Sequence, residues 1–230
     1  MIAVVTGSNR GLGWHVAHQL AERGYHVVTC ARSHEAATQV AESIRERGGE
    51  ASPFMLDVCD AEQIHALGAW LGQLFGGVEV LVNNAGIFID QSQSLSDITL
   101  EQWQQTLTTN VTGAMLMCKM ILPLMRPRGY GRIVNVSSGY GSLAEMGELQ
   151  VAYRVSKAAL NALTRVVASE VSDEGIKVNS VCPGWARTDM GGPQASRDPA
   201  ESANWITWAA TLDPQGPNGA FLRDGKSIPW

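Results

Sequence analysis

Hydrophobic positions along the chain gather into short runs that alternate with longer amphipathic stretches. The short runs are almost continuously apolar and rich in β-branched residues, which is typical of strands buried on both faces of a parallel sheet. Six strands are therefore expected, at residues 2–5, 26–30, 53–56, 78–82, 132–136 and 177–181.

The stretches between these runs have the spacing of amphipathic helices, at residues 13–25, 34–48, 60–75, 99–126 and 152–173. Strands that alternate with helices in this way predict a βαβ series, and hence an α/β fold with a doubly wound, mostly parallel sheet of the Rossmann type. Beyond Pro183 the pattern weakens before a short helix expected near 199–210. We expect residues 187–210 to form a lid over a substrate.

Composition narrows the class of protein. The 230 residues are 45% hydrophobic and contain no linker, so a single domain over 1–230 is expected. The net charge of −5 comes without a basic stripe, which argues against a nucleic-acid or membrane partner and favours a small molecule. Four cysteines without a CxxC pair are expected to be buried free thiols. No signal peptide or apolar run of membrane-spanning length is expected, which predicts a soluble, cytoplasmic protein.

The stretch "TGSNRGLG" at residues 6–13 follows the first expected strand directly. A strand that turns abruptly into a helix aims backbone N–H groups and the helix dipole at one point, which suits a pyrophosphate. Gly7, Gly11 and Gly13 would remove side chains from the turn, from the closest approach to a ligand and from the helix–sheet contact. The alternative is a tight turn without a ligand.

The spacing of these glycines resembles that of the short-chain dehydrogenase/reductase family. Four further family motifs follow in order, namely "NNAG" (83–86), "VNVSS" (134–138), "YRVSK" (153–157) and "VNSVCPGWARTDM" (178–190). The last motif and the ending "IPW" most resemble the carbonyl-reductase-like branch. The resemblance spans about residues 1–190 and implies an oxidoreductase that uses a nicotinamide dinucleotide.

The end of the second expected strand indicates which dinucleotide. No acidic residue lies between Tyr25 and His34 to hold the ribose 2′-hydroxyl that distinguishes NAD. Arg32, together with Arg10 in the glycine loop, could grip a 2′-phosphate instead, which predicts NADP(H). The alternative is that both arginines are solvated surface charges.

The resemblance assigns the other cofactor contacts. It implies that Asp57 and Val58 border the adenine, that the "NNAG" residues line the adenosine side, and that Thr188 binds the nicotinamide carboxamide. The expected cofactor-binding residues are Gly7, Asn9, Arg10, Gly11, Leu12, Gly13, Arg32, Asp57, Val58, Asn83, Ala85, Gly86, Tyr153, Lys157, Pro183, Gly184 and Thr188. Asp57 could instead cap the helix that follows it, although Asp60 is better placed to do so.

Tyr153 and Lys157 are expected to carry the chemistry. At positions i and i+4 they share one helix face, where the ammonium should lower the pKa of the phenol from about 10 to roughly 8.5. The resemblance implies that the tyrosine protonates a carbonyl oxygen during reduction. It also implies that the lysine holds the nicotinamide ribose.

Two further catalytic residues follow from the resemblance. Ser138 would bind the substrate oxygen, and Asn110 would hold a water molecule that links Lys157 to solvent. Ser138 and Tyr153 are 15 positions apart, which is longer than the family commonly shows. We expect the extra residues, within 139–150, to enlarge a loop at the substrate mouth, and Ser137 is the alternative if the register differs. An apolar pocket wall is expected from Leu143, Met146, Trp185 and Met190.

No metal site is expected, because His15 and His18 form an HxxH pair without a visible third ligand. The apolar helices at 99–126 and 152–173 favour a homo-oligomer, although the same residues could be ordinary core. The leading functional hypothesis is NADPH-dependent reduction of a ketone or aldehyde. An NADP-dependent alcohol, sugar or steroid dehydrogenase is the close alternative, and a non-catalytic NADPH-sensing protein is the second.

Overall fold

Eight strands form one sheet in the computed structural model, which describes all residues from Met1 to Trp230. Their spatial order is β3-β2-β1-β4-β5-β6-β7-β8, and every neighbouring pair except β7 and β8 is parallel. The strands are β1 (Ile2–Thr6), β2 (His26–Ala31), β3 (Glu50–Met55), β4 (Val80–Asn83), β5 (Gly131–Val136), β6 (Ile176–Val181), β7 (Phe221–Arg223) and β8 (Lys226–Ser227).

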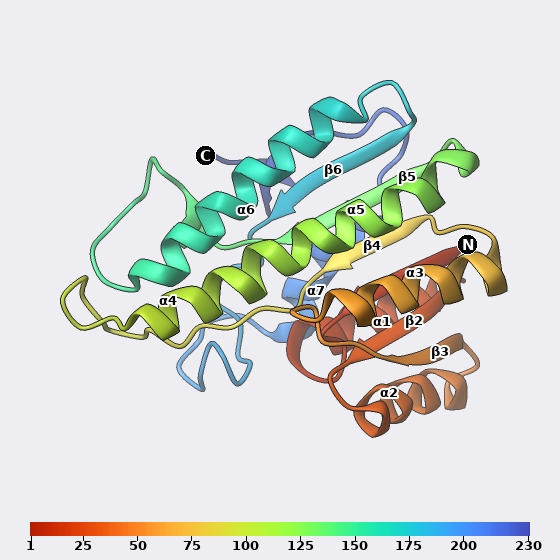
Figure 1. Ribbon diagram of the computed structural model, residues 1–230, viewed down its shortest axis with the longest axis horizontal. Helices are drawn as coiled ribbons and strands as arrows, with labels where there is room; N and C mark the ends of the chain where they lie inside the picture. Colours follow the sequence, from red (N-terminus) through yellow and green to blue (C-terminus); the bar gives the residue numbers. More distant parts are fainter.

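Helices cover both faces of the sheet (Figure 1). One face packs against α1 (Gly11–Glu22), α2 (His34–Glu46) and α7 (Pro199–Ala210), and the apolar side chains between these layers form one buried cluster. The other face packs against α3 (Ala61–Phe75), α5 (Gly113–Met125) and α6 (Val151–Glu170), around a second buried cluster. The prediction of a doubly wound, mostly parallel α/β fold is confirmed.

The strand order reverses between β1 and β4, because the chain returns to the middle of the sheet after building β2 and β3 outward. In folds of this kind, ligands bind in the crevice beyond the carboxyl ends of the strands at that reversal. The loops that follow the strands at this edge are therefore where a ligand is expected. Sequence patterning missed β7 and β8, because strands of three and two residues are too short to show a period.

The helix expected over residues 99–126 is interrupted. It consists of α4 (Leu100–Leu107), a π-helical turn (Thr108–Thr112), α5 and a final 3₁₀ turn (Arg126–Arg128). The continuous stretch Leu100–Arg128 is 29 residues long and has a mean hydropathy of 1.2 in its most apolar window. By length and composition it could cross a membrane, which corrects the expectation that no such run exists. Its apolar side, including Met117 and Ile121, is buried against the sheet.

The segment expected to form a lid divides into two parts. Its second half is α7, whose residues Ala203, Ile206, Ala209 and Ala210 are buried in the core beside α1. A helix buried in this way cannot open and close over a ligand without disrupting the core. We therefore restrict the prediction of a lid to residues 187–198.

The four cysteines are free, but they are not all buried. Cys30, Cys118 and Cys182 are buried, whereas Cys59 is exposed. Cys59 follows β3 in the turn before α3, where its Sγ lies 3.3 Å from the hydroxyl of Thr109. The expectation of four buried thiols is wrong for this residue, because the turn places it at the surface.

Candidate active site

The glycine loop between β1 and α1 needs its three glycines for two reasons. Gly7 and Gly11 adopt φ values of 63° and 55°, in the left-handed region that favours glycine. Gly13 is required by close packing instead, because an added Cβ would overlap the carbonyl oxygen of Gly7 and lie 2.5 Å from Nδ2 of Asn84. The loop therefore brings bare backbone to the start of α1.

The amino terminus of α1 lacks a side-chain cap. The N-cap residues of α2, α3, α4 and α7 each accept a hydrogen bond from their own first turn, whereas Arg10 at the start of α1 does not. The first N–H groups of α1 remain available for an anion, which a helix dipole also favours. The arrangement fits the pyrophosphate of a dinucleotide.

Asn84 ties this loop to the end of β4, and the sequence analysis did not single it out. Its amide donates hydrogen bonds to the carbonyl oxygens of Thr6 and Gly7, at 2.9 and 3.0 Å. The hydroxyl of Thr6 in turn accepts from the backbone N–H groups of Asn84 and Ala85. Asn83, by contrast, points into the interior and donates to Asn135 at 2.9 Å, so only its backbone could face a cofactor.

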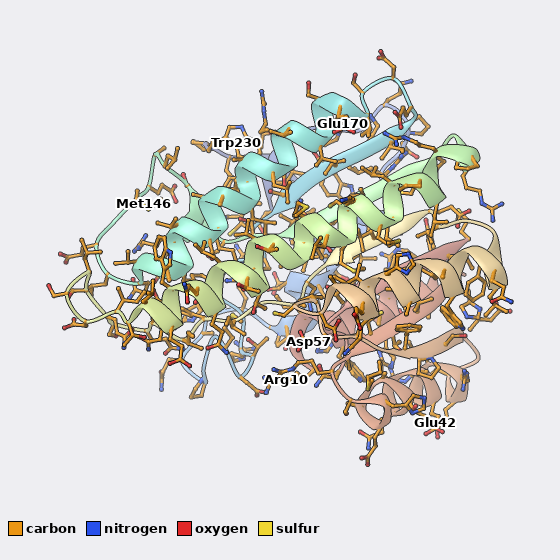
Figure 2. All side chains as sticks on the ribbon, in the orientation of Figure 1. Arg10, Glu42, Asp57, Met146, Glu170 and Trp230 are labelled. Carbon is orange, nitrogen blue, oxygen red and sulfur yellow. The ribbon has the colours of Figure 1, made fainter.

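The two arginines expected to bind a 2′-phosphate have different surroundings. Arg10 forms an exposed ion pair with Asp189 at 2.7 Å, so a carboxylate from the 187–198 segment already contacts its guanidinium. Arg32 is exposed just beyond β2 and forms no ion pair. Arg32 acts on Cys59, the neighbour of Val58 in the next loop: its positive charge partly opposes the rise in the pKa of that thiol, which burial causes. Figure 2 labels Arg10 and Asp57, which both follow strands at the carboxyl edge of the sheet.

Asp57 and Val58 lie in the loop between β3 and α3. The carboxylate of Asp57 accepts from the N–H of Cys59 at 2.9 Å, which forms a local turn. Asp60, rather than Asp57, caps α3 by accepting from the N–H groups of Glu62 and Gln63. The side chain of Asp57 is thus not needed as a helix cap.

Tyr153 and Lys157 lie in the first turns of α6, with 7% and 5% of their surfaces exposed. The lysine Nζ donates to the carbonyl oxygen of Val136 at 2.8 Å, and it lies 5.6 Å from the centre of the Tyr153 ring. Gly86, at the end of the "NNAG" motif, completes the group, because an added Cβ would come 3.6 Å from that Nζ. The two side chains therefore meet where β4 and β5 end.

Burial corrects the expected pKa of Tyr153. Removal from water, the largest effect, raises the pKa of the phenol well above its usual value. Burial also lowers the pKa of Lys157 to about 8. The expected phenol pKa of roughly 8.5 assumed a full ammonium charge in contact with it. In this structure the ammonium is directed to Val136, and the phenol stays protonated at neutral pH.

Ser138, not Ser137, is the serine that faces Tyr153. The Ser138 hydroxyl opposes the rise in the pKa of the phenol. The same oxygen accepts from the N–H of Tyr140 at 3.2 Å and begins the short 3₁₀ turn Gly139–Gly141. Ser137 is buried, and its hydroxyl is directed to the carbonyl oxygen of Lys157. The longer spacing to Tyr153 is taken up by the loop after Gly141.

Asn110 lies in the π-helical turn and is buried. Its Oδ1 accepts from the N–H of Ile87 at 2.8 Å, and its Nδ2 donates to the carbonyl oxygen of Ile87 and to the hydroxyl of Ser156. Ser156 in turn donates to the carbonyl oxygen of Tyr153. The side chain of Asn110 thus joins the loop after β4 to α6, and its expected hold on a water molecule stays a prediction.

The expected nicotinamide side follows β6. Pro183 and Gly184 come directly after this strand, and Gly184 adopts a φ of 76° against the side chain of Arg197. Thr188 lies beside the glycine loop, since a Cβ on Gly11 would come 3.3 Å from its methyl group. The end of the motif at 178–190 therefore lies beside the glycine loop at 6–13.

The residues expected to form an apolar pocket wall lie at the surface, and the wall itself stays a prediction. Leu143, Met146, Trp185 and Met190 are all exposed hydrophobic residues. Figure 2 shows Met146 on the projecting loop between β5 and α6. Sequence analysis did not identify two aromatic residues whose rings contact Tyr153. Phe88 stacks on Tyr153 with ring centres 4.2 Å apart, and the Tyr140 ring lies edge-on at 6.3 Å.

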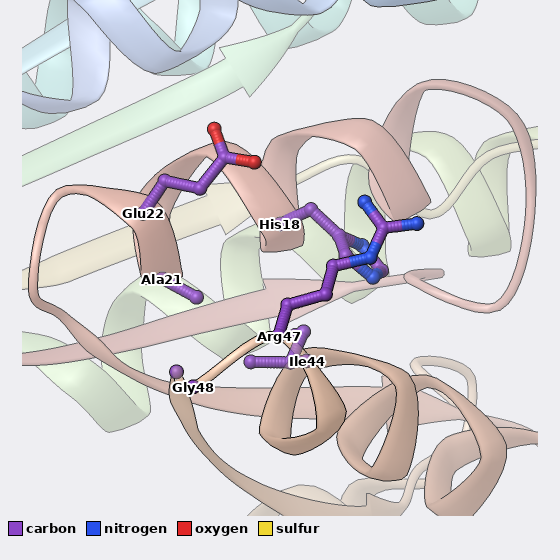
Figure 3. A pocket seen from close by; sticks show the side chains of 7 residues that line it. His18, Ala21, Glu22, Ile44, Arg47 and Gly48 are labelled. Atoms are coloured by element: carbon purple, nitrogen blue, oxygen red, sulfur yellow. The ribbon is translucent and has the colours of Figure 1, made fainter.

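A hollow lies away from these residues, toward the carboxyl ends of α1 and α2 (Figure 3). It has a volume of about 320 Å³ and is lined by His18, Glu22 and Arg47, together with Ala21, Ile44, Gly48 and Gly49. The His18 ring is already bound by the carbonyl oxygen of Trp14 and the hydroxyl of Ser43, at 2.8 and 2.9 Å. These contacts give the histidine a structural role in joining α1 to α2.

A family model for short chain dehydrogenases matches residues 1–199. Carbonyl reductase (NADPH) 1 of Mus musculus is 31% identical, and the alignment covers all of this chain and 98% of that protein. The 3-oxoacyl-acyl-carrier-protein reductase of Staphylococcus aureus is 37% identical over 82% of this chain and 75% of its own. The crystal structure of a single-site variant of actinorhodin polyketide ketoreductase with NADPH superposes with a TM-score of 0.87, at 29% identity, over 97% of this chain and 95% of that one.

The chain belongs to the short-chain dehydrogenase family, and it is an oxidoreductase of that family. The full-length similarity to carbonyl reductases agrees with the carbonyl-reductase-like branch expected from its motifs.

Proposed function

We propose that the protein reduces a ketone or aldehyde with NADPH and that Tyr153 donates the proton. The observation that carries the proposal is the meeting of Tyr153, Lys157 and Ser138 beside Gly86, at the edge of the sheet that also holds the uncapped start of α1. The NADPH-dependent carbonyl reductases and the NADPH-bound ketoreductase among its relatives support this choice.

Ser138, Tyr153 and Lys157 each have a separate role in the proposed reduction. NADPH, when bound, supplies the hydride that goes to the carbonyl carbon. Ser138 holds the substrate oxygen by a hydrogen bond, and the Tyr153 phenol gives its proton to that oxygen as negative charge develops there. The raised pKa keeps the phenol in its protonated, donating form at neutral pH. The nearby ammonium of Lys157 stabilises the phenolate that remains.

The glycine loop and the loops after β2 and β3 form the cofactor side of this proposal. The N–H groups at the start of α1 would hold the pyrophosphate, and Arg32 would hold the 2′-phosphate that distinguishes NADP(H). Arg10 would contribute after exchanging Asp189 for the phosphate.

The substrate side favours an apolar or aromatic carbonyl compound. Phe88 and Tyr140 lie against Tyr153, and stacked or edge-on rings suit a flat aromatic group. An NADP-dependent alcohol, sugar or steroid dehydrogenase would share the same catalytic residues, and the direction of the reaction would depend on the supply of oxidised or reduced cofactor.

Purified protein incubated with NADPH and a panel of aldehydes, ketones and quinones tests the proposal through the loss of NADPH absorbance. We expect turnover with aromatic ketones or aldehydes and little with charged sugars. Tight NADPH binding without turnover of any carbonyl compound would favour a sensing protein and contradict the proposal.

A further inference from the structure

The five residues from Gly86 to Asp90, which follow β4, contact three of the four expected catalytic residues. Gly86 lies against Asn110 and Lys157, the backbone of Ile87 is bound twice by the Asn110 amide, and the Phe88 ring stacks on Tyr153. Asp90 ends this segment and is fully buried. This one segment therefore contacts Asn110, Tyr153 and Lys157 together.

Asp90 binds the start of α6 from 62 positions away in the chain. Its Oδ2 accepts hydrogen bonds from the backbone N–H groups of Ala152 and Tyr153, at 2.8 and 3.2 Å. These are the second and third residues of the helix, whose N–H groups a local capping side chain would ordinarily bind. The carboxylate thus replaces a local cap and contacts the catalytic tyrosine directly through its backbone.

The chain leading into α6 is strained and is bound by the turn that Asp90 begins. Gln150 at the N-cap makes no capping hydrogen bond, and both Leu149 and Gln150 adopt left-handed φ values, of 61° and 47°, that are unfavourable for residues other than glycine. The N–H of Gln150 donates to the carbonyl oxygen of Gln93, in the turn that Asp90 begins. The turn at 90–93 therefore holds the entry to the helix.

The second carboxylate oxygen of Asp90, Oδ1, is buried without a hydrogen-bond partner. An unpartnered buried carboxylate oxygen is costly, so the position is poorly explained by stability alone. Its negative charge is one of those that raise the pKa of Tyr153, after burial itself. The other groups that face the phenol are Ser138 and Tyr140 from the loop after β5, Cys182 at the end of β6, and Lys157 on α6 itself.

We propose that Asp90 is a positioning residue of the active site, which fixes the backbone of Tyr153 through a cap supplied from the loop after β4 and sets the charge that its phenol faces. The proposal rests on the proposed function, because it concerns the residue that donates the proton there. It names a carboxylate outside the family motifs as part of the machinery.

Three variants test this role. Asp90→Ala removes the cap and the charge, and Asp90→Asn keeps an amide oxygen as acceptor but removes the charge. Asp60→Ala is the matched control, since Asp60 also caps a helix by accepting from two N–H groups, and α3 carries none of the catalytic residues. All are measured in the full chain.

We expect Asp90→Ala to lower kcat for carbonyl reduction by about 10- to 100-fold, because a displaced proton donor is poorly aligned. Binding of NADPH should change by less than about 3-fold, since the glycine loop is untouched. Asp90→Asn should keep kcat within about 3-fold of the unmodified protein, because both N–H groups retain an acceptor. A loss of kcat in Asp90→Ala no greater than that in Asp60→Ala would overturn the proposal.

The pH profile separates positioning from a purely structural cap. In the direction of alcohol oxidation the Tyr153 phenolate accepts the proton of the alcohol. The rate therefore rises with pH as the phenol becomes deprotonated. Removing the charge in Asp90→Asn lowers the pKa of the phenol, and the rise should move to lower pH. A profile that coincides with that of the unmodified protein would overturn the proposal, and this measurement decides alone if Asp90→Ala does not fold.

Amide hydrogen exchange of Ala152 and Tyr153 gives a readout that needs no turnover. Exchange in Asp90→Ala should be faster by about 10-fold or more, because the two N–H groups lose their acceptor. Unchanged exchange contradicts the cap. If the unmodified protein reduces no carbonyl compound while exchange accelerates as expected, the proposed function fails and the cap itself stands.

Discussion

The rings of Phe88 and Tyr153 are stacked, with their centres 4.2 Å apart and their planes inclined by 29°. This contact covers one face of the tyrosine that we propose as the proton donor. It also restricts the rotation of the phenol, since a neighbouring ring fills the space into which it would turn. Stacked aromatic pairs contribute about 1 kcal/mol beyond the burial of their surfaces.

We expect Phe88→Ala to lower kcat/KM for carbonyl reduction by about 5- to 10-fold, because the phenol loses the ring that orients it. The control is Phe54→Ala, which removes a ring packed on Trp70 at 5.3 Å, away from the site. Steady-state kinetics with NADPH in excess measure the effect. Equal losses in the two variants would show that Phe88 contributes only to packing.

Lys157 provides a prediction about stability. Burial lowers its pKa from 10.5 to about 8, so the folded state binds this proton less tightly than the unfolded chain does. The cost of burying the charge is on the order of 3 kcal/mol below pH 8, and it disappears between pH 8 and pH 10.5 as the lysine becomes neutral in both states. Stability from this group therefore rises with pH across that window.

Lys157→Met should remove this dependence and raise the free energy of unfolding at pH 7, while abolishing most of the activity. Urea denaturation at several values between pH 7 and pH 10 measures both effects. A variant less stable than the unmodified protein at pH 7 would mean that the hydrogen bond from Lys157 to Val136 outweighs the cost of burial.

Arg32 tests the choice of cofactor. Arg32→Asp should shift the ratio of the KM values for NADPH and NADH in favour of NADH by about 10-fold or more, because a carboxylate repels the 2′-phosphate and can bind a 2′-hydroxyl. Kinetics with both cofactors give the ratio. An unchanged ratio would assign Arg32 to the solvated surface.

Gly13 tests the packing of the glycine loop. Gly13→Ala would place a Cβ within overlap distance of the Gly7 carbonyl oxygen, which a rigid backbone cannot accept. We expect the free energy of unfolding to fall by about 1 to 3 kcal/mol, together with weaker NADPH binding. Gly76→Ala is the control, since an added Cβ there meets no atom within 4 Å and only its φ of 67° is unfavourable. A smaller loss for Gly13→Ala than for Gly76→Ala would contradict the packing.

The strands β1, β2, β4, β5 and β6 could be predicted because each is buried on both faces and so leaves an apolar run in the sequence. The edge strand β3 is partly exposed, and the sequence predicted only its second half. The site could be predicted only as far as local motifs reach. Spacing brought Tyr153 and Lys157 to one helix face, yet it gave no information on the direction of the ammonium or on the burial that raises the pKa of the phenol. The pKa prediction was wrong for that reason.

Contacts between distant segments left no local pattern to read. The hydrogen bonds of Asp90 to α6, the ion pair of Arg10 with Asp189 and the stacking of Phe88 on Tyr153 join residues that are far apart in the chain. Asp90 itself resembles any other acidic loop residue in sequence. Its burial and its two backbone donors appear only when the fold brings the loop after β4 against α6.

The most direct test of the account is Tyr153→Phe, measured for both turnover and NADPH binding. The change removes only the phenol oxygen, and the ring can keep its contacts with Phe88 and Tyr140. We expect kcat for carbonyl reduction to fall by about 10²- to 10⁴-fold, with the Kd for NADPH nearly unchanged. A variant that turns over carbonyl compounds at the rate of the unmodified protein would contradict the assignment of Tyr153 as the proton donor.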